Sequence, residues 1–288
     1  KIFNHVTGRI RYVGFELGIG GIRPRSAGET YVSGMGDCKD ITLVLVALLR
    51  AAGMDARMAL VRTGDRGVTD MDTPWIGAFN HAICFVNIDG GFFLDGTAEL
   101  AGYREIPEFD RNVPALVMDE RGFRFIEVES PRFERNLLAI ENEVALGADG
   151  SASVVRRFHK QGGMYAPSGR YALQEESGIM GNISEFWNGA YPGSAISDFR
   201  VLENGLEKPV RYEYSVKVPS FGQAQDGIIS FRSMMVPTNA FRSYGSVRRK
   251  KRPLFLGGQF ESVEIMRYRI PEGFEAHRVP ENGKFTAG

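Results

Sequence analysis

The sequence is poor in the side chains that bind metals and cross-link small folds. Among 288 residues there are two cysteines, Cys38 and Cys84, and four histidines. Two cysteines cannot build a fold held by disulfides, and a closed structural zinc site needs four ligands. The sequence therefore excludes both classes, and any cysteine chemistry has to involve single residues.

Net charge and long apolar runs are absent as well. The 35 lysines and arginines balance the 35 aspartates and glutamates, so no overall field attracts nucleic acid or an anionic membrane. No apolar run approaches the roughly 18 residues that a membrane-spanning helix needs. We therefore predict a globular chain with no transmembrane segment and no nucleic-acid partner, long enough for two domains.

The first residues carry no targeting signal. No signal peptide heads the chain, and Lys1 leads without a methionine directly into an apolar pattern. We therefore expect the chain to be a piece of a longer protein.

Helical and strand-like patterns alternate in the first half of the sequence. The periodicity predicts helices over residues 1–13, 26–32 and 38–53. It predicts strands over residues 56–62, 81–87 and 91–95. The last two strands flank the turn signal Ile88-Asp89-Gly90, which is typical of a β-hairpin.

Cys38 opens the predicted helix over 38–53. A helix N-terminus supplies unpaired N–H groups and the positive end of the helix dipole, and both stabilise a thiolate. The backbone N–H of Cys38 would also face a developing oxyanion, and Gly36 allows a tight turn before it. The alternative is an apolar filler, since free cysteines are often buried. The charged neighbours Asp37 and Lys39 favour the rim of a cleft instead.

His81 and Asp95 are the predicted base and the acid that orients it. Such an acid fixes the imidazole tautomer and stabilises the imidazolium. His81 begins the first strand of the hairpin and Asp95 ends the second. Because side chains alternate faces along a strand, a three-residue connection over 88–90 places both on one face. A two-residue Asp89-Gly90 turn would place them on opposite faces.

Cys84 lies an odd number of positions after His81 on the same strand, so it faces the other way. We therefore predict Cys84 to be a core residue. A metal site formed by Cys38, His81 and Cys84 lacks a fourth ligand and conflicts with this alternation. A Cys38–Cys84 disulfide is disfavoured on the same ground, and we predict neither a metal nor another cofactor.

The second half is predicted to be β-rich with one helix. A boundary at 131–136 would divide the chain into domains of residues 1–135 and 136–288. Apolar spacing predicts a helix over 171–187 and strands over 137–158, 195–201, 210–218, 228–236 and 263–270. The predicted fold class is therefore α+β.

Five segments of the first half form an ordered set. They are Arg11-Tyr12-Val13-Gly14, residues 24–31, Gly36-Asp37-Cys38-Lys39-Asp40, Phe79-Asn80-His81-Ala82-Ile83 and Phe93-Leu94-Asp95-Gly96-Thr97. This set resembles the bacterial transglutaminase-like family, whose core fold is similar to that of papain-like enzymes. The resemblance spans residues 1–130 and implies Cys38, His81 and Asp95 as a catalytic triad. Gly96 stands where relatives often carry proline, which we expect to loosen the turn after Asp95.

The triad implies cysteine-dependent acyl transfer on a protein or peptide substrate through a thioester. The resemblance favours hydrolysis, as in a peptidase or amidase, over cross-linking. Relatives are multidomain envelope proteins with β-rich domains before and after the core, which implies a periplasmic or envelope location and a further N-terminal domain. The alternative is a non-catalytic binding or scaffold module. Candidate substrate-binding or oxyanion residues are Gly36, Asp37, Asn80, Trp75 and Tyr31.

Overall fold

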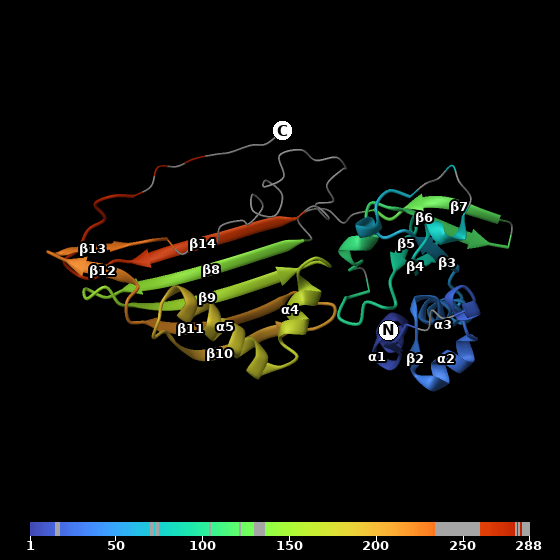
Figure 1. Cartoon of the computed structure of the whole chain (residues 1–288), viewed down its shortest axis with the longest axis horizontal. Helices are drawn as coiled ribbons and strands as arrows, with labels where there is room; N and C mark the ends of the chain where they lie inside the picture. Colours follow the sequence, from blue (N-terminus) through green and yellow to red (C-terminus); the bar gives the residue numbers. More distant parts are fainter. Residues whose placement is uncertain are drawn as a thin grey trace.

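The computed structural model describes residues 1–14, 18–69, 72, 75–103, 105–120, 122–129, 136–233, 260–279, 281 and 283. They form two parts that lie side by side, each with a five-stranded sheet (Figure 1). Among these residues, no helix is both long enough and apolar enough to cross a membrane. The boundary predicted at 131–136 falls outside the described residues, apart from Asn136.

Helices and an antiparallel sheet make up the first part. The helices are α1 (Ile2–Arg9), α2 (Ala27–Ser33) and α3 (Cys38–Ala51). The sheet has the order β5-β4-β3-β6-β7, with β3 (Ala56–Val61), β4 (His81–Val86), β5 (Phe92–Leu94), β6 (Pro114–Asp119) and β7 (Gly122–Glu127). A parallel pair joins β1 (Arg11–Tyr12) to β2 (Met35–Gly36). Short 3₁₀ turns are η1 (Gly18–Gly21), η2 (Gly64–Arg66), η3 (Ile76–Ala78) and η4 (Glu108–Asp110).

Helix α3 occupies the centre of the core on one face of this sheet. Ile41 and Leu45 are fully buried there, among side chains of α1, β3 and β4. At the start of α3, the side chain of Asp37 accepts a hydrogen bond from the N–H of Asp40 at 3.3 Å, and the side chain of Asp40 accepts one from the N–H of Asp37 at 3.4 Å. This capping box fixes the helix start at Cys38, as the sequence predicts.

The register of the β4–β5 hairpin is the one expected for a three-residue connection over residues 88–90. The paired residues are Cys84 and Leu94, Phe85 and Phe93, and Val86 and Phe92. Continued in both directions, this register sets Asn87 opposite Gly91 and His81 opposite Thr97. The prediction that His81 and Asp95 share a face is therefore confirmed.

The second part is a five-stranded sheet covered by two helices. Its strand order is β10-β11-β9-β8-β14, with β8 (Leu137–Leu146), β9 (Ala152–Gln161), β10 (Ala195–Asn204), β11 (Val210–Val218) and β14 (Glu261–Arg269). The helices are α4 (Ala166–Ala172) and α5 (Glu176–Ala190), and a separate hairpin is formed by β12 (Gly222–Gln225) and β13 (Ile228–Phe231). Strand β14 runs parallel to β8, whereas the other neighbours are antiparallel.

Trp187 of α5 anchors this helix to the second sheet. It is fully buried, and its indole Nε1–H donates to the hydroxyl of Tyr214 on β11 at 3.2 Å. The single helix predicted over 171–187 is in fact two helices, because the chain turns between Ala172 and Glu176. The predicted strands agree with β8 to β11 and β14, while the end of the strand predicted over 228–236 lies outside the described residues.

Arg170 of α4 joins the two parts. Its side chain is 4 % exposed. Nη1 donates to the carbonyl oxygen of Leu100 at 2.7 Å and to Glu105 Oε2 at 2.5 Å, and Nη2 donates to the carbonyl oxygens of Leu206 at 3.1 Å and Lys208 at 2.8 Å. Leu100 and Glu105 follow β5, whereas Leu206 and Lys208 connect β10 to β11. Arg170 therefore ties the loop after β5 to the second part.

Replacing Arg170 with methionine should destabilise the protein markedly, because Glu105 and four carbonyl oxygens, Gly205 included, lose their buried donor. Breaking a buried pair costs about 3–5 kcal/mol, which a urea unfolding titration can measure. The matched control is Arg267→Met, which removes an ion pair to Glu141 between side chains that are 54 % and 43 % exposed. That change should cost about 1 kcal/mol or less. Equal losses in the two variants would contradict the role of Arg170.

Candidate active site

Cys38 is the first residue of α3, and its side chain lies at the edge of the core with 9 % of its surface exposed. N–H groups in the first turn of a helix have no partner within the helix. The thiol therefore lies beside unpaired donors at the positive end of the helix dipole. This position suits a nucleophile that develops negative charge.

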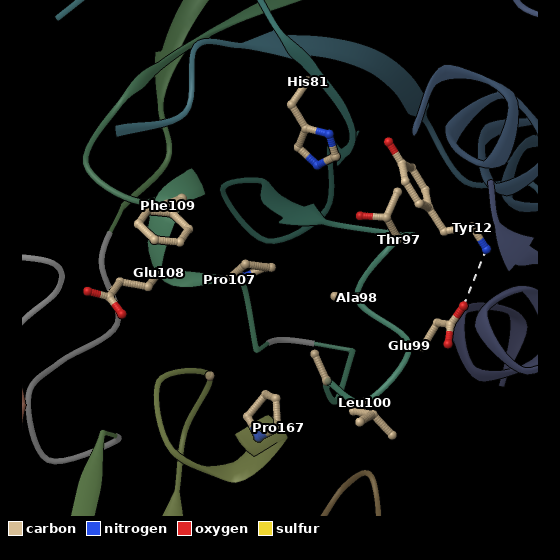
Figure 2. Close-up of a pocket in the computed structure, with 12 residues that line it drawn as sticks. Tyr12, His81, Thr97, Ala98, Glu99, Leu100, Pro107, Glu108, Phe109 and Pro167 are labelled. Atoms are coloured by element: carbon tan, nitrogen blue, oxygen red, sulfur yellow. Dashed lines mark hydrogen bonds between the residues drawn. The ribbon is translucent and has the colours of Figure 1, made fainter. Parts of the chain in front are cut away.

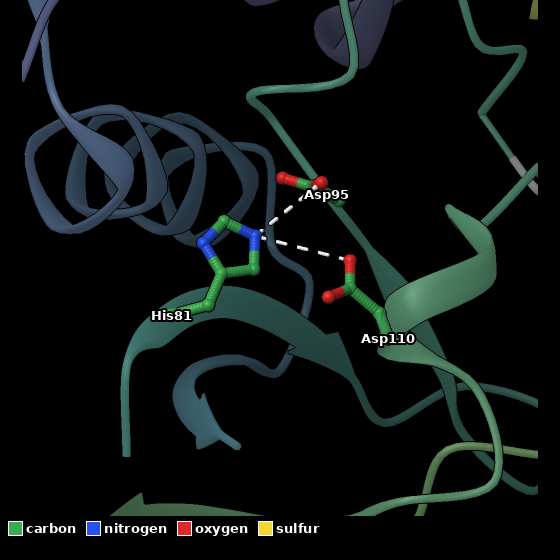
Figure 3. A group of neighbouring side chains, drawn as sticks. All are labelled: His81, Asp95 and Asp110. Atoms are coloured by element: carbon green, nitrogen blue, oxygen red, sulfur yellow. Dashed lines mark ion pairs between the residues drawn. The ribbon is translucent and has the colours of Figure 1, made fainter. Parts of the chain in front are cut away.

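His81 lies beside a carboxylate. Its Nε2 is 3.4 Å from Asp95 Oδ2 (Figure 3), and Cys38 is near enough to the His81 side chain to affect its pKa. Burial by itself lowers the pKa of His81, but the negative charge of Asp95 and the hydrogen bonds to Asp95 and Cys38 outweigh it. The pKa of His81 is therefore raised well above its usual range, and the imidazolium form is favoured at neutral pH.

Asp95 is held as an anion by several donors. Its Oδ1 accepts hydrogen bonds from the N–H of Thr97 at 2.8 Å and from the hydroxyl of Thr97 at 2.7 Å. Burial acts to raise the pKa of Asp95, but the charge of His81 and these hydrogen bonds lower it below its usual value. The turn that Gly96 was expected to loosen is therefore fixed by Thr97.

Asp110 is a site residue that the sequence analysis did not identify. It ends η4, and its Oδ2 lies 3.8 Å from His81 Nε2 on the same side of the ring as Asp95 (Figure 3). Burial and the negative charge of Asp95 raise the pKa of Asp110 to about 7. No local pattern marks Asp110, because the loop after β5 brings it to His81 only in the folded chain.

Cys84 lies on the other face of β4, as predicted. It is fully buried among residues of α1 and α3, whereas its neighbours Ile83 and Phe85 belong to the core on the opposite face of the sheet. Burial raises the pKa of the Cys84 thiol to about 12. Both cysteines are free thiols, so Cys84 is a core residue and not a partner of Cys38.

Gly36 and Asp37 support the turn that precedes Cys38. A side chain at Gly36 would bring Cβ within 2.8 Å of the Cβ atom of Asp40 and within 2.9 Å of the Cγ2 atom of Thr30. Asp37 is 1 % exposed, caps α3 and forms an ion pair with Lys39. Both residues lie just before Cys38 in the chain, and their contacts hold the turn that leads into α3.

Tyr31 and Asn80 contact other parts of the fold, and Trp75 is largely exposed. Tyr31 packs under the guanidinium of Arg9, with 4.5 Å between Cζ and the ring centre. The side chain of Asn80 accepts a hydrogen bond from the N–H of Thr63 at 2.9 Å and so holds the end of β3. Trp75 is 65 % exposed. None of these three side chains lines the pocket beside His81.

A pocket of about 570 Å³ opens beside His81 (Figure 2). Residues 97–101 and Tyr12 form one wall and residues 107–109 another, while Gly163 and Pro167 of the second part form the far end. The N–H of Tyr12 donates to Glu99 Oε1 at 3.3 Å across this wall. Both halves of the chain therefore contribute to the pocket that reaches the candidate base.

The same cluster offers possible metal ligands. Nitrogen and oxygen atoms of His81, Asp95 and Asp110 lie within 4.8 Å of one another. A divalent cation can bridge atoms at such a spacing. A cation on Nε2 would replace the contact between His81 and Asp95, so it competes with the acid–base arrangement.

Comparisons with known proteins find a similarity to a known family within the first part. One similar solved structure is a crystal structure of "a putative protease" from Parabacteroides distasonis ATCC 8503, whose sequence is 13 % identical to this one. The match covers 75 % of this chain and 44 % of that chain, with a TM-score of 0.40. The chain thus spans less than half the length of that protein. No curated protein matches the chain. The family model described as transglutaminase-like superfamily matches residues 1–92, a range that includes Cys38 and His81 and ends shortly before Asp95. Residues 1–92 are therefore similar to the transglutaminase-like superfamily.

Proposed function

We propose that the protein is a cysteine-dependent enzyme that cleaves a peptide or amide bond through a thioester on Cys38. The observation that carries the proposal is the position of His81, whose Nε2 lies 3.4 Å from Asp95 Oδ2 and whose pKa is raised in part by Cys38. A nucleophile, a base in contact with it and a third group that orients the base are the requirements for this chemistry.

The two ring nitrogens of His81 have separate tasks in this mechanism. Nε2 faces Asp95, so Nδ1 is the nitrogen left to exchange a proton with the thiol. Asp95 fixes this tautomer and stabilises the imidazolium. The raised pKa of His81 supports the proposal, because a protonated His81 stabilises a thiolate on Cys38 and supplies the proton that the leaving group needs.

Each half of the reaction moves one proton through Nδ1. His81 takes the thiol proton, the sulfur bonds to the carbonyl carbon, and the imidazolium returns the proton to the nitrogen as the C–N bond breaks. A thioester and a free amine result. Water then gives a proton to Nδ1, its oxygen bonds to the thioester carbon, and the C–S bond breaks as the proton returns to sulfur. The backbone N–H of Cys38 is a donor for the oxyanion in both halves.

The pocket beside His81 is the proposed substrate site. It adjoins Nδ1 and Nε2 of the candidate base, and Tyr12 and Phe109 offer aromatic contacts along its walls.

We propose water as the acceptor of the acyl group. A fluorescent primary amine such as dansylcadaverine tests this choice, because its covalent incorporation into a protein substrate would assign cross-linking instead.

A non-catalytic binding module is the second candidate function. The observation that favours it is the low exposure of Cys38, at 9 %, since a substrate has to reach the sulfur. In such a module, the pocket beside His81 would hold a peptide without cleaving it. The reactivity of Cys38 separates the two candidates.

Cys38 should react with iodoacetamide at pH 6 at least about ten-fold faster than N-acetylcysteine, because an ordinary thiol is almost fully protonated there. Mass spectrometry of the intact protein and its peptides measures the rate. Cys84 serves as an internal control, since it is fully buried and its pKa is raised to about 12, so it should take label only after denaturation. A Cys38 rate no higher than that of N-acetylcysteine would favour the binding module.

Replacing Asp95 with asparagine should slow alkylation of Cys38 at pH 6 by at least about ten-fold. The variant removes the negative charge that raises the pKa of His81, so less imidazolium is present to stabilise the thiolate. Near pH 9.5 the rates of variant and wild type should converge, because the thiol then ionises without help. The matched control is Asp226→Asn in an exposed turn, which should match wild type at both pH values. Equal slowing at both pH values would point to altered access instead of charge.

A further inference from the structure

Asp110 presents a buried oxygen atom to His81 from an element that the proposed mechanism does not use. Its side chain is 3 % exposed, and its Oδ2, which lies 3.8 Å from His81 Nε2, has no hydrogen-bond partner among the described residues. Buried polar atoms without a partner are uncommon in folded proteins, and a bound ion is one of their physical explanations. Oδ2 of Asp110 is therefore an acceptor that a ligand can use.

Asp95 and Asp110 approach the same nitrogen of His81 (Figure 3). The distances from Nε2 are 3.4 Å to Asp95 Oδ2 and 3.8 Å to Asp110 Oδ2, and one ligand atom of each residue lies within 4.8 Å of the others. Tetrahedral zinc, with bonds of about 2.0–2.2 Å, holds its ligand atoms roughly 3.3–3.6 Å apart. Small rotations of the carboxyl groups would bring the three atoms to that spacing, so the cluster fits a small divalent ion.

Neighbouring groups hold the two carboxyl groups in this arrangement. Oδ1 of Asp95 accepts hydrogen bonds from the N–H and the hydroxyl of Thr97, which leaves Oδ2 facing His81. The loop that carries Asp110 is fixed by Arg111, whose Nε donates to a backbone carbonyl oxygen at 2.7 Å. Carboxylates that bind metals are in turn hydrogen-bonded by groups of this kind. The cluster is therefore supported before any ion arrives.

The charges around the cluster favour a cation. Two carboxylates face a single imidazole, and Arg111, which is 1 % exposed and follows Asp110 in the chain, adds one positive charge. With a neutral imidazole, which is the form that binds metals, the carboxylates exceed the guanidinium by one charge. A divalent ion is therefore attracted to the cluster, although Arg111 offsets part of the attraction.

The pocket beside His81 gives an ion access to the cluster. His81 and residues 107–109, directly before Asp110, line this pocket (Figure 2). Three protein ligands and one open position are typical of zinc sites that exchange ligands. One imidazole and two carboxylates suit zinc and other divalent transition metals, whereas calcium takes roughly six to eight oxygen ligands. The absence of a metal was predicted from the sequence without Asp110, which reaches His81 only in the folded chain.

We propose that His81 Nε2, Asp95 and Asp110 bind a divalent transition-metal ion, with zinc as the best match, and that this ion reversibly blocks His81 as the base. The ion replaces the proton on Nε2, which leaves to water. A neutral imidazole bound through Nε2 carries its one proton on Nδ1, so Nδ1 has no lone pair to accept a proton from the thiol or from water. The metal site is independent of the proposed function, and only the block of catalysis rests on it.

Isothermal titration of the Cys38→Ala protein with zinc chloride tests the site without the thiol. One zinc ion should bind per chain, and calcium chloride should give no comparable binding. Asp110→Asn in the same background should weaken zinc binding by at least about ten-fold, because the amide has no charge. The matched control is Glu108→Gln, whose carboxylate lines the same pocket but points away from His81 (Figure 2), so zinc should bind it as it binds Cys38→Ala.

Three results would overturn the metal site. Zinc that binds wild type but not Cys38→Ala would show that the thiol is a ligand. Equal weakening by Asp110→Asn and Glu108→Gln would show that the charge of the pocket, and not Asp110, holds the ion. Cobalt chloride gives an independent reading on wild type, where visible absorption of the bound ion should appear without the near-ultraviolet band of a sulfur ligand. A sulfur band would be the third contrary result.

Hydrolysis of p-nitrophenyl acetate measures the block of His81. Saturating zinc should lower Cys38-dependent turnover by at least about ten-fold, and EDTA should restore it. In Asp110→Asn, the zinc concentration that halves the variant's own metal-free rate should rise as much as the zinc dissociation constant does. Zinc that binds without slowing turnover would overturn the block. If metal-free wild type shows no Cys38-dependent turnover while Cys38→Ala binds zinc, the proposed function fails and the metal site stands.

Discussion

The pairing register of β4 with β5 is the constraint on which the candidate site depends. A slip of one residue would move His81 and Asp95 to opposite faces. Packing on both faces resists such a slip: the rings of Phe85 and Phe93 lie 5.2 Å apart on one face, and Cys84 and Leu94 are buried against the helices on the other. The geometry of the site is thus a product of core packing.

Helix α3 meets this hairpin at a close approach. A side chain at Gly96 would place Cβ 2.8 Å from the Cγ2 atom of Ile41, so the backbone after Asp95 passes close to α3 at a residue that has no side chain. The hydroxyl of Thr42 adds a hydrogen bond to the carbonyl oxygen of Ala82 at 2.9 Å. These contacts bring the capped start of α3, and with it Cys38, near the start of β4, where His81 lies.

Local signals in the sequence were sufficient for the elements that carry the site. The periodicity that begins at Cys38 predicts the start of α3, and strand alternation predicts the opposite faces of His81 and Cys84. Asp110 was beyond prediction because its place depends on a loop fixed by Arg111 and by contacts from the second part. The break between α4 and α5 was also missed, since apolar spacing continues across it. Long-range contacts, which leave no periodic pattern, account for the missed position of Asp110.

The central claim is that His81 carries a positive charge at neutral pH because it lies between the Cys38 sulfur and the Asp95 carboxylate. Nitrogen chemical shifts of the four histidines, assigned with His81→Gln, measure this charge directly by NMR. We predict an imidazolium for His81 in wild type at pH 7 and a lower His81 pKa in the Asp95→Asn protein. A neutral His81 ring in wild type at pH 7 would contradict the account.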